Sequence, residues 1–244
     1  VENLVIHIIT DSATRDAAFR VNAIDVTQMD PKEWVEFRQE EPMAPFIMTR
    51  DAGTGLEVAL KTTLPPFDDI RARKAAFQSM DPWEAIQDLW LGAGFVSLGF
   101  PVMESDWLLD EEEIRNYFGH PQQAKELLRD MGSGMKVPIS IKVGDFGETY
   151  LDHADRISDE MRSVGFDVSL DLVNRKVFGD EVWLGGDYQM FVGPTAPVAT
   201  TNGYLLSVLH SQGKWNTTEY WDEQLDKRIE TQAIELDSSV RKEL

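Results

Sequence analysis

The stretch that decides the fold lies between residues 137 and 172 and reads VPISIKVGDFGETYLDHADRISDEMRSVGFDVSLDL. At both ends of this stretch apolar residues alternate with other residues, which is the two-residue period of a β-strand. Between the two ends, apolar residues recur at helical spacing from Leu151 to Val164, and Gly165 follows as a helix stop. Two strands joined by such a helix form a β-α-β unit with parallel strands. The predicted fold class is therefore α/β.

The composition is that of an acidic globular protein without thiols. The chain has 244 residues, of which 42% are hydrophobic, and this is enough to fill a core. It carries 23 basic and 43 acidic residues, and the resulting net charge of -20 repels phosphate backbones and anionic lipids. We therefore expect neither nucleic acid nor a membrane surface as a partner. The chain contains no cysteine, which excludes disulfides, thiolate nucleophiles and cysteine-based metal sites.

Further segments predict helices and strands around the β-α-β unit. Alternating apolar residues predict three more strands, at residues 4–8, 24–26 and 188–192, and a fourth is expected at 56–60. Capping residues and apolar spacing predict helices at residues 12–21, 31–37, 81–90, 121–131, 201–210 and 219–234. Prolines 42 and 45 are typical of a connector, so we expect a boundary between two lobes near them.

A second informative stretch, LPPFDDIRARKAAF, covers residues 64–77. Its two prolines hold the backbone extended, and Asp68 or Asp69 can cap the helix that follows. Ile70, Phe77 and the alanines between them form the expected packing stripe. The basic residues of this helix are expected to point outward and to serve structure rather than ligand binding: Arg71, Arg73 and Lys74.

The sequence carries no recognised catalytic motif. Its four histidines do not form a two-histidine zinc motif, and the glycine patterns of phosphate loops and nucleophile elbows are absent from the sequence. His153, beside Asp152 and Asp155, is a weak candidate for a metal cluster, but carboxylates at a helix start explain the pattern more simply. The acidic run at 110–113 is likewise interpreted as an exposed helix start.

Four segments follow one another in an order that is characteristic of one family. They read IITDSATRDAAFRVNAIDV at 8–26, LPPFDDIRARKAAF at 64–77, PQQAKELL at 121–128 and YWDEQLD at 220–226. In this order they resemble the C-terminal portion of bacterial extracellular solute-binding proteins of family 5, the peptide- and nickel-binding type that serves ABC importers. The resemblance extends over nearly the whole chain.

The resemblance implies a two-lobed fold of the type II periplasmic-binding-protein kind, with a mixed sheet and flanking helices. It assigns residues 1–48 to an incomplete first lobe and residues 49–244 to the second lobe, without the usual C-terminal return to the first. The implied function is that of the extracytoplasmic solute-binding component of an ABC importer. Such a component binds a peptide-like or other small polar solute between its lobes and delivers it to a membrane permease.

By the same resemblance we expect no enzymatic activity, no cofactor and no metal. The protein is expected to be a monomer in the periplasm or outside the cell, with or without a lipid anchor. Its export signal is expected to lie outside these residues.

The segment after the strand at 188–192 is the expected ligand-binding loop. In peptide-binding relatives it carries a tryptophan and an aspartate, and the aspartate pairs with the free amino group of the ligand. On a gap-free match these positions are Pro194 and Pro197, so the charged anchor is missing and a neutral solute is favoured. Backbone polar groups of a proline-rich loop suit hydrogen bonding to such a solute. The expected ligand-binding residues are Gly193, Pro194, Thr195, Ala196, Asn202 and Tyr204.

Other interpretations stay open at this stage. The excess of carboxylates would suit a glycan hydrolase, because two carboxyl groups at the right separation are sufficient for glycoside hydrolysis. The missing anchor would suit a non-catalytic interaction module, and the loop itself would then be a surface turn. One or two tryptophans are expected to face a ligand, from the set Trp83, Trp90, Trp107, Trp183, Trp215 and Trp221.

Overall fold

The structure, a computed structural model, describes most of the chain in two units. The described residues are 2–47, 55–92, 94–98, 107, 109–132, 136–196, 198 and 200–244. Contacts divide the chain into Val1–Ile47 and Met48–Leu244, and each unit is described by itself. The assignment of these two units to lobes stays a prediction. Within the described ranges, no helix combines the length and the apolar character that crossing a membrane requires.

The first unit contains two short helices that share an aromatic contact. α1 spans Ser12–Arg20 and α2 spans Pro31–Glu40, and an aspartate side chain caps the first turn of each. The rings of Phe19 and Phe37 lie 5.8 Å apart between them. Both helices are where the capping residues predict them.

The two strands predicted in the first unit are wrong. Residues 4–8 and 24–26 belong to no strand, and Leu4, Ile6 and Ile8 are exposed. A strand satisfies its backbone polar groups only by pairing with a neighbour. Neither segment pairs with the other or with any strand in the described ranges, so alternation of apolar residues alone does not produce a strand here.

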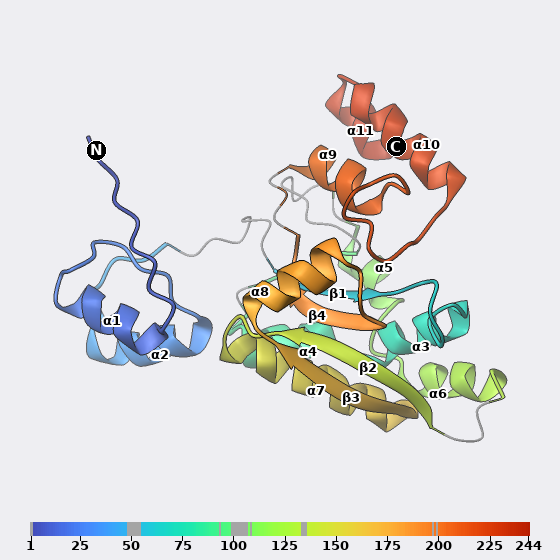
Figure 1. The fold of residues 1–244 in the computed structure, drawn as a ribbon, viewed down its shortest axis with the longest axis horizontal. Coiled ribbons are helices and arrows are strands. Elements are labelled where there is room, and N and C mark those ends of the chain that lie inside the picture. The colour runs from blue at the N-terminus through green and yellow to red at the C-terminus, as the bar shows by residue number, and fades with distance from the viewer. Residues whose placement is uncertain are drawn as a thin grey trace. The chain divides into compact units, whose positions relative to one another are not determined.

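The second unit is built on a four-stranded sheet in the order β1-β4-β2-β3 (Figure 1). β1 spans Leu56–Leu60, β2 Val137–Gly144, β3 Phe166–Val173 and β4 Met190–Pro194. β2 pairs in parallel with β3 and with β4, whereas β1 pairs antiparallel with β4. The predicted β-α-β unit, the α/β class and the mixed sheet are thereby confirmed, and β4 begins two residues later than predicted.

Side chains of β1 and β4 alternate between two hydrophobic clusters on opposite faces of the sheet. Met190 and Val192 of β4 belong to the larger cluster, together with Ile141 of β2. Phe191 of β4 belongs to the smaller cluster, together with Ala59 of β1. This is the two-residue period of a sheet that is covered on both faces.

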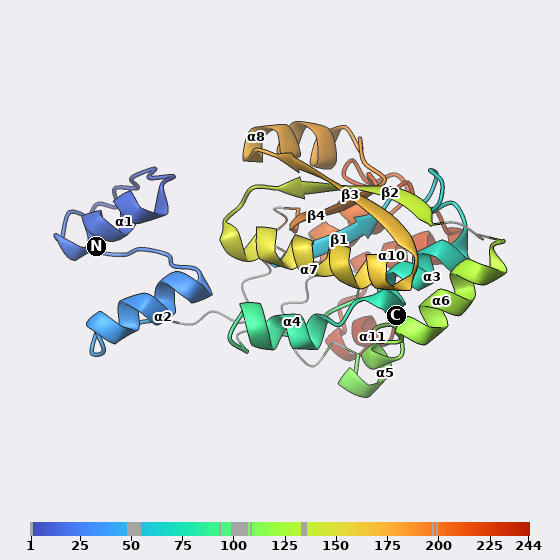
Figure 2. The same ribbon diagram turned by 90° about the horizontal axis from the view of Figure 1, so that it is seen from below.

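Helices cover both faces of the sheet (Figure 2). α3 (Ile70–Ser79), α6 (Pro121–Asp130) and α7 (Glu148–Val164) supply the larger cluster, and α8 (Arg175–Phe178) with the π-helical turn η2 (Gly179–Leu184) supplies the smaller one. The crossover helix α7 ends where the sequence predicts, because the residue after it is a glycine with φ 126°.

The stretch at 64–77 supports the larger cluster. Phe67 is fully buried, and Asp69 caps α3 by accepting the backbone N–H two residues later. The three alanines of α3 are buried and allow its close packing on α6, but the predicted contribution of Ile70 is wrong, because that side chain is 54% exposed. The guanidinium of Arg73 donates to the carbonyl oxygen of Phe67 at 2.7 Å, which is a structural contact.

Two shorter helices lie between α3 and α6 in the sequence. α4 (Pro82–Leu89) is capped by Asp81 as predicted, and Ala85 is its fully buried side chain. α5 (Glu111–Arg115) begins at the exposed acidic run, as predicted. Gly92, Gly94 and Gly99 interrupt the helical pattern and predict a loop at 98–107, of which only residues 98 and 107 lie in the described ranges.

The C-terminal part adds four helical segments beside the sheet. α9 (Thr201–Tyr204) continues into the π-helical turn η3 (Leu205–Leu209), and together they account for the predicted helix at 201–210. α10 (Glu223–Ile234) begins four residues later than predicted, because the side chain of Asp222 caps it. α11 follows at residues 238–243.

Candidate functional site

One edge of the sheet collects the carboxyl ends of three strands. β2 ends at Gly144, β3 at Val173 and β4 at Pro194, and because these strands are parallel their ends lie at the same edge. The antiparallel β1 begins at this edge with Leu56. Ligands of open α/β sheets bind outside the carboxyl ends of the strands. The predicted loop, which follows β4, therefore starts at the edge where a ligand is expected.

Three of the predicted site residues belong to the end of β4 and the turn after it. Gly193 and Pro194 pair with Glu57 and Leu56 of β1, and the backbone N–H of Thr195 extends this ladder by donating to the carbonyl oxygen of residue 55 at 3.1 Å. Gly193 is buried, and the next two residues are half-buried. Pro197, the position matched to the missing anchor, lies outside the described residues.

The other three predicted residues lie where α9 packs against the loop. Ala196 and Tyr204 share a small hydrophobic cluster with Val208, and both are buried. The side-chain oxygen of Asn202 accepts from the amide of Gln232 on α10 at 2.7 Å. The structure thus brings the six predicted residues into one region, with Asn202 engaged by a neighbouring helix.

Gly193 also has a packing role that its place in the loop did not indicate. A Cβ at this position would lie 2.3 Å from the ring of Phe178, and one at Gly144 on the adjacent strand would lie 2.8 Å from the same ring. No side chain tolerates such contacts, so both glycines allow Phe178 to rest directly on the sheet. Phe178 is fully buried and contacts the rings of Phe146 and Trp183.

A residue that the sequence analysis missed, Glu57 on β1, contacts this same region. It lies opposite Gly193 in the ladder, and its carboxylate accepts the hydroxyl of Tyr204 at 3.1 Å and the backbone N–H of Ala196. Desolvation is the largest influence on this carboxyl group and raises its pKa from 4.5 to about 7. Burial, with the nearby charge of Glu57, also raises the pKa of Tyr204, so its hydroxyl keeps the proton that it donates.

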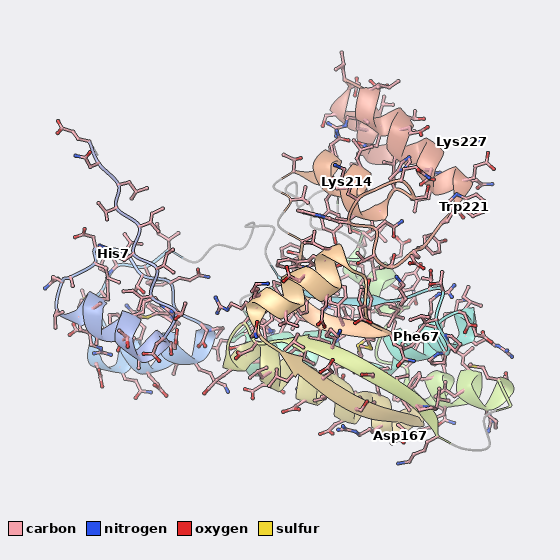
Figure 3. The ribbon with its side chains drawn as sticks, viewed as in Figure 1. His7, Phe67, Asp167, Lys214, Trp221 and Lys227 are labelled. Carbon is pink, nitrogen blue, oxygen red and sulfur yellow. The ribbon has the colours of Figure 1, made fainter. Side chains whose placement is uncertain are left out.

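The aromatic residues expected to face a ligand are distributed over several places. Trp183 adjoins the predicted site: its ring packs against the cluster of Ala196 and Tyr204, and its indole N–H has no partner among the described residues. Trp215 packs on the same cluster. Trp221 is 69% exposed and points away from the sheet (Figure 3).

The surroundings of His153, the weak metal candidate, differ from what its sequence neighbours Asp152 and Asp155 suggest. His153 is buried on α7, and its Nδ1 accepts the indole N–H of Trp90 at 3.2 Å. Within the described ranges, no three histidine or acidic side chains are grouped as metal ligands would be. The ring of His153 is therefore used in packing α4 against α7.

A mixed sheet with helices on both faces and with three strands ending at one edge agrees with a type II, periplasmic-binding-protein-like fold. Solved structures share this fold. The ABC transporter substrate-binding protein CtaP from Listeria monocytogenes is 16% identical with a TM-score of 0.80, over 97% of this chain and 48% of that one. The oligopeptide-binding protein AppA from Bacillus subtilis, in complex with a nonapeptide, is 15% identical with a TM-score of 0.79, over 97% and 49%.

Sequence comparison gives the family. The family model of bacterial extracellular solute-binding proteins, family 5 Middle, matches residues 1–217, so the chain belongs to that family. A curated relative, heme-binding protein A from Haemophilus influenzae, is 26% identical over 131 residues, which are 54% of this chain and 23% of that protein. The chain spans about half the length of the solved structures that it matches and about a quarter of this curated relative.

Proposed function

We propose that this chain is part of the extracytoplasmic solute-binding component of an ABC importer. The observation that carries the proposal is the family match over residues 1–217, together with a fold shared with transporter substrate-binding proteins over 97% of the chain. The solute, peptide-like or another small polar molecule, is captured between two lobes and passed to a membrane permease. The component is periplasmic or extracellular, with or without a lipid anchor, and acts as a monomer.

In this proposal the second lobe, residues 49–244, carries the expected ligand-binding loop, and residues 1–48 belong to the first lobe. The half-buried end of β4 and the loop after it offer backbone groups at the carboxyl edge of the sheet. The ligand-contacting residues are Gly193, Pro194, Thr195, Ala196, Asn202 and Tyr204. Binding and release are the whole task, and no bond is made or broken.

The competing hydrolase hypothesis has no support in the geometry of the site. Among the described residues, Glu57 on β1 has the hydroxyl of Tyr204 and a backbone N–H as its hydrogen-bond partners, and neither is a second carboxyl group. Glycoside hydrolysis requires two carboxyl groups that flank the scissile bond. A panel of glycans incubated with the protein should remain intact, and turnover that a single acid-to-amide substitution abolishes would restore the hydrolase.

The experiment that tests the proposal is mass spectrometry of the small molecules released when the purified full-length protein is denatured. We expect one compound in stoichiometric amount, or, where none is retained, saturable binding of at least one member of a peptide and nutrient library. Neither result would be obtained from an interaction module. Failure to retain or bind any small molecule, together with stoichiometric capture of a protein partner, would replace the proposal with that module.

A further inference from the structure

We propose that Gln232 and Arg241 are positioning residues: they fix the side-chain amide of Asn202 so that its NH2 group, a hydrogen-bond donor, is offered to the bound solute. The inference rests on the proposed function and assigns a recognition chemistry to Asn202, which is to meet an acceptor oxygen of the solute, such as a carbonyl or carboxylate oxygen. The three residues lie on α9, α10 and α11, which contact one another beside the sheet (Figure 1).

The first argument is that the side-chain amide of Gln232 has one orientation that satisfies its neighbours. Gln232 is buried, and its side-chain oxygen accepts from the guanidinium of Arg241 at 3.1 Å. Its side-chain nitrogen donates to the backbone carbonyl oxygen of Ile229 at 3.0 Å. A guanidinium only donates and a carbonyl oxygen only accepts, so turning this amide over would set donor against donor and acceptor against acceptor. The guanidinium of Arg241 is itself held over the ring of Trp107, 5.4 Å from the ring centroid.

The second argument is that the orientation of Gln232 decides the orientation of Asn202. The side-chain nitrogen of Gln232 also donates to the side-chain oxygen of Asn202 at 2.7 Å. Because only the oxygen of an amide group accepts, the NH2 group of Asn202 is turned away from Gln232. We call these three residues the amide relay: Arg241 donates to Gln232, Gln232 donates to Asn202, and Asn202 is left with its donor facing outward.

The third argument is that the NH2 group of Asn202 is open to a ligand. Asn202 is half-buried, and its side-chain nitrogen has no hydrogen-bond partner among the described residues. This nitrogen is also not one of the enclosed side-chain atoms that lack a partner in the described ranges, so it is accessible to solvent. Buried polar groups are ordinarily paired, and an accessible donor with no partner in the protein is free to bind an acceptor.

The fourth argument is the place of Asn202 at the carboxyl edge of the sheet. It lies on the first turn of α9, directly after the loop that follows β4. The helix is tied to this edge by Tyr204, whose hydroxyl donates to Glu57 on β1 at 3.1 Å. A few polar groups in fixed orientations are what gives a ligand pocket its specificity. The amide relay fixes one such group from behind, through helices that need not touch the solute.

Nuclear magnetic resonance of the full-length protein, with isotope-labelled asparagine and glutamine, tests the positioning without any solute. We expect the side-chain NH2 protons of Asn202 to exchange rapidly with water and those of Gln232 slowly. In Gln232→Glu the new carboxylate, kept ionised by Arg241, only accepts, so Asn202 should turn over and donate to it. Exchange of the Asn202 protons should then slow by about tenfold or more. Gln224→Glu, the same change at an exposed position of α10, is the matched control and should leave this exchange unchanged.

Calorimetric titration tests whether the solute uses this donor. The probe is the compound released from the denatured protein or, where none is retained, trialanine, whose peptide carbonyls and carboxylate are acceptors. Asn202→Asp keeps the contact with Gln232 but replaces the NH2 group by an oxygen, and it should weaken binding by about tenfold or more. Gln232→Glu should weaken binding to a similar extent, and Gln224→Glu should bind as the wild type does.

A double variant separates positioning from a merely structural role. Gln232→Glu combined with Asn202→Ala should bind no more weakly than Asn202→Ala alone, because the relay then has no amide left to orient. A structural role of Gln232 would instead give losses that add.

Several results would overturn the proposal. They are additive losses in the double variant, wild-type affinity of Asn202→Asp, slow exchange of the Asn202 NH2 protons in the wild type, equal exchange in Gln232→Glu, and, where no solute is retained, no binding of trialanine. The wild-type exchange and the affinity of Asn202→Asp decide the matter even if Gln232→Glu does not fold. The proposed function is judged separately, by binding to the peptide and nutrient library, so the relay can fail while solute binding stands.

Discussion

Protonation of His153 should destabilise the packing of α4 on α7 as the pH falls. The ring is 8% exposed, and its Nδ1 accepts the indole N–H of Trp90 at 3.2 Å. Burial, with a smaller contribution from the neighbouring Arg156, lowers the pKa of His153 from 6.5 to about 4. A proton on Nδ1 would set one donor against another and break this bond.

The direction and size of the effect follow from the two states of the chain. The unfolded state takes up the proton near pH 6.5 and the folded state only near pH 4, so the contribution of neutral His153 is complete above pH 6.5 and is lost as the pH falls towards 4. Across the whole window the free energy of unfolding decreases by about 3 kcal/mol. About 2 kcal/mol of this should be lost by pH 5, before most carboxylates titrate.

The assay is urea unfolding of the wild type and of His153→Gln at pH 7.5, 6.5, 5.5 and 5.0. The variant should be less stable at pH 7.5, because it lacks the imidazole that accepts from Trp90. It should lose less stability on acidification, because it also lacks the titrating group. The difference between the two proteins isolates His153, because all other groups titrate in both. His7→Gln, at an exposed position in the first unit, is the control and should follow the wild type. A wild-type-minus-variant difference that stays constant across this range would refute the reasoning.

Further predictions concern the carboxyl edge of the sheet. Gly193→Ala should cost about 1–3 kcal/mol of unfolding free energy in urea titrations, because the new Cβ meets Phe178 at 2.3 Å, and adding Phe178→Leu should recover part of this loss. Gly55→Ala, which meets no atom within 4 Å, is its control, and equal effects of the two would contradict the packing argument. Glu57→Gln should gain stability relative to the wild type as the pH rises from 4.5 through 7, by up to about 3 kcal/mol, because the folded wild type holds Glu57 in its protonated form. If the free energies of unfolding of the two proteins differ by the same amount at pH 5 and at pH 8, this prediction is wrong.

The parts of the fold that the sequence predicts well are those whose local signals agree with one another. Between residues 137 and 172 the strand period, the helical period and a terminal glycine all indicate the same elements, and the structure has them. The segments at 4–8 and 24–26 show the strand period alone. Whether such a segment pairs depends on a neighbouring strand, which local sequence cannot specify.

The sequence could predict only the part of the candidate site that lies on one continuous segment of the chain. The loop from Gly193 to Tyr204 could be located because it follows a recognisable strand. Glu57 lies more than a hundred residues earlier, in LEVAL, where an acid between apolar residues looks like an ordinary outward-facing position of a strand. Its role depends on which strand it pairs with and in which register, and these are properties of the assembled sheet.

Register also connects the packing of Phe178 with the placement of Glu57 at this edge. A shift of one residue in the β1–β4 pairing would turn Glu57 to the opposite face, into the larger hydrophobic cluster, so that pairing places the acid. The partner of Glu57 in this pairing is Gly193, which must stay small because Phe178 rests on it. A side chain at Gly193 would therefore be expected to disturb the position of Glu57 as well as the packing of Phe178.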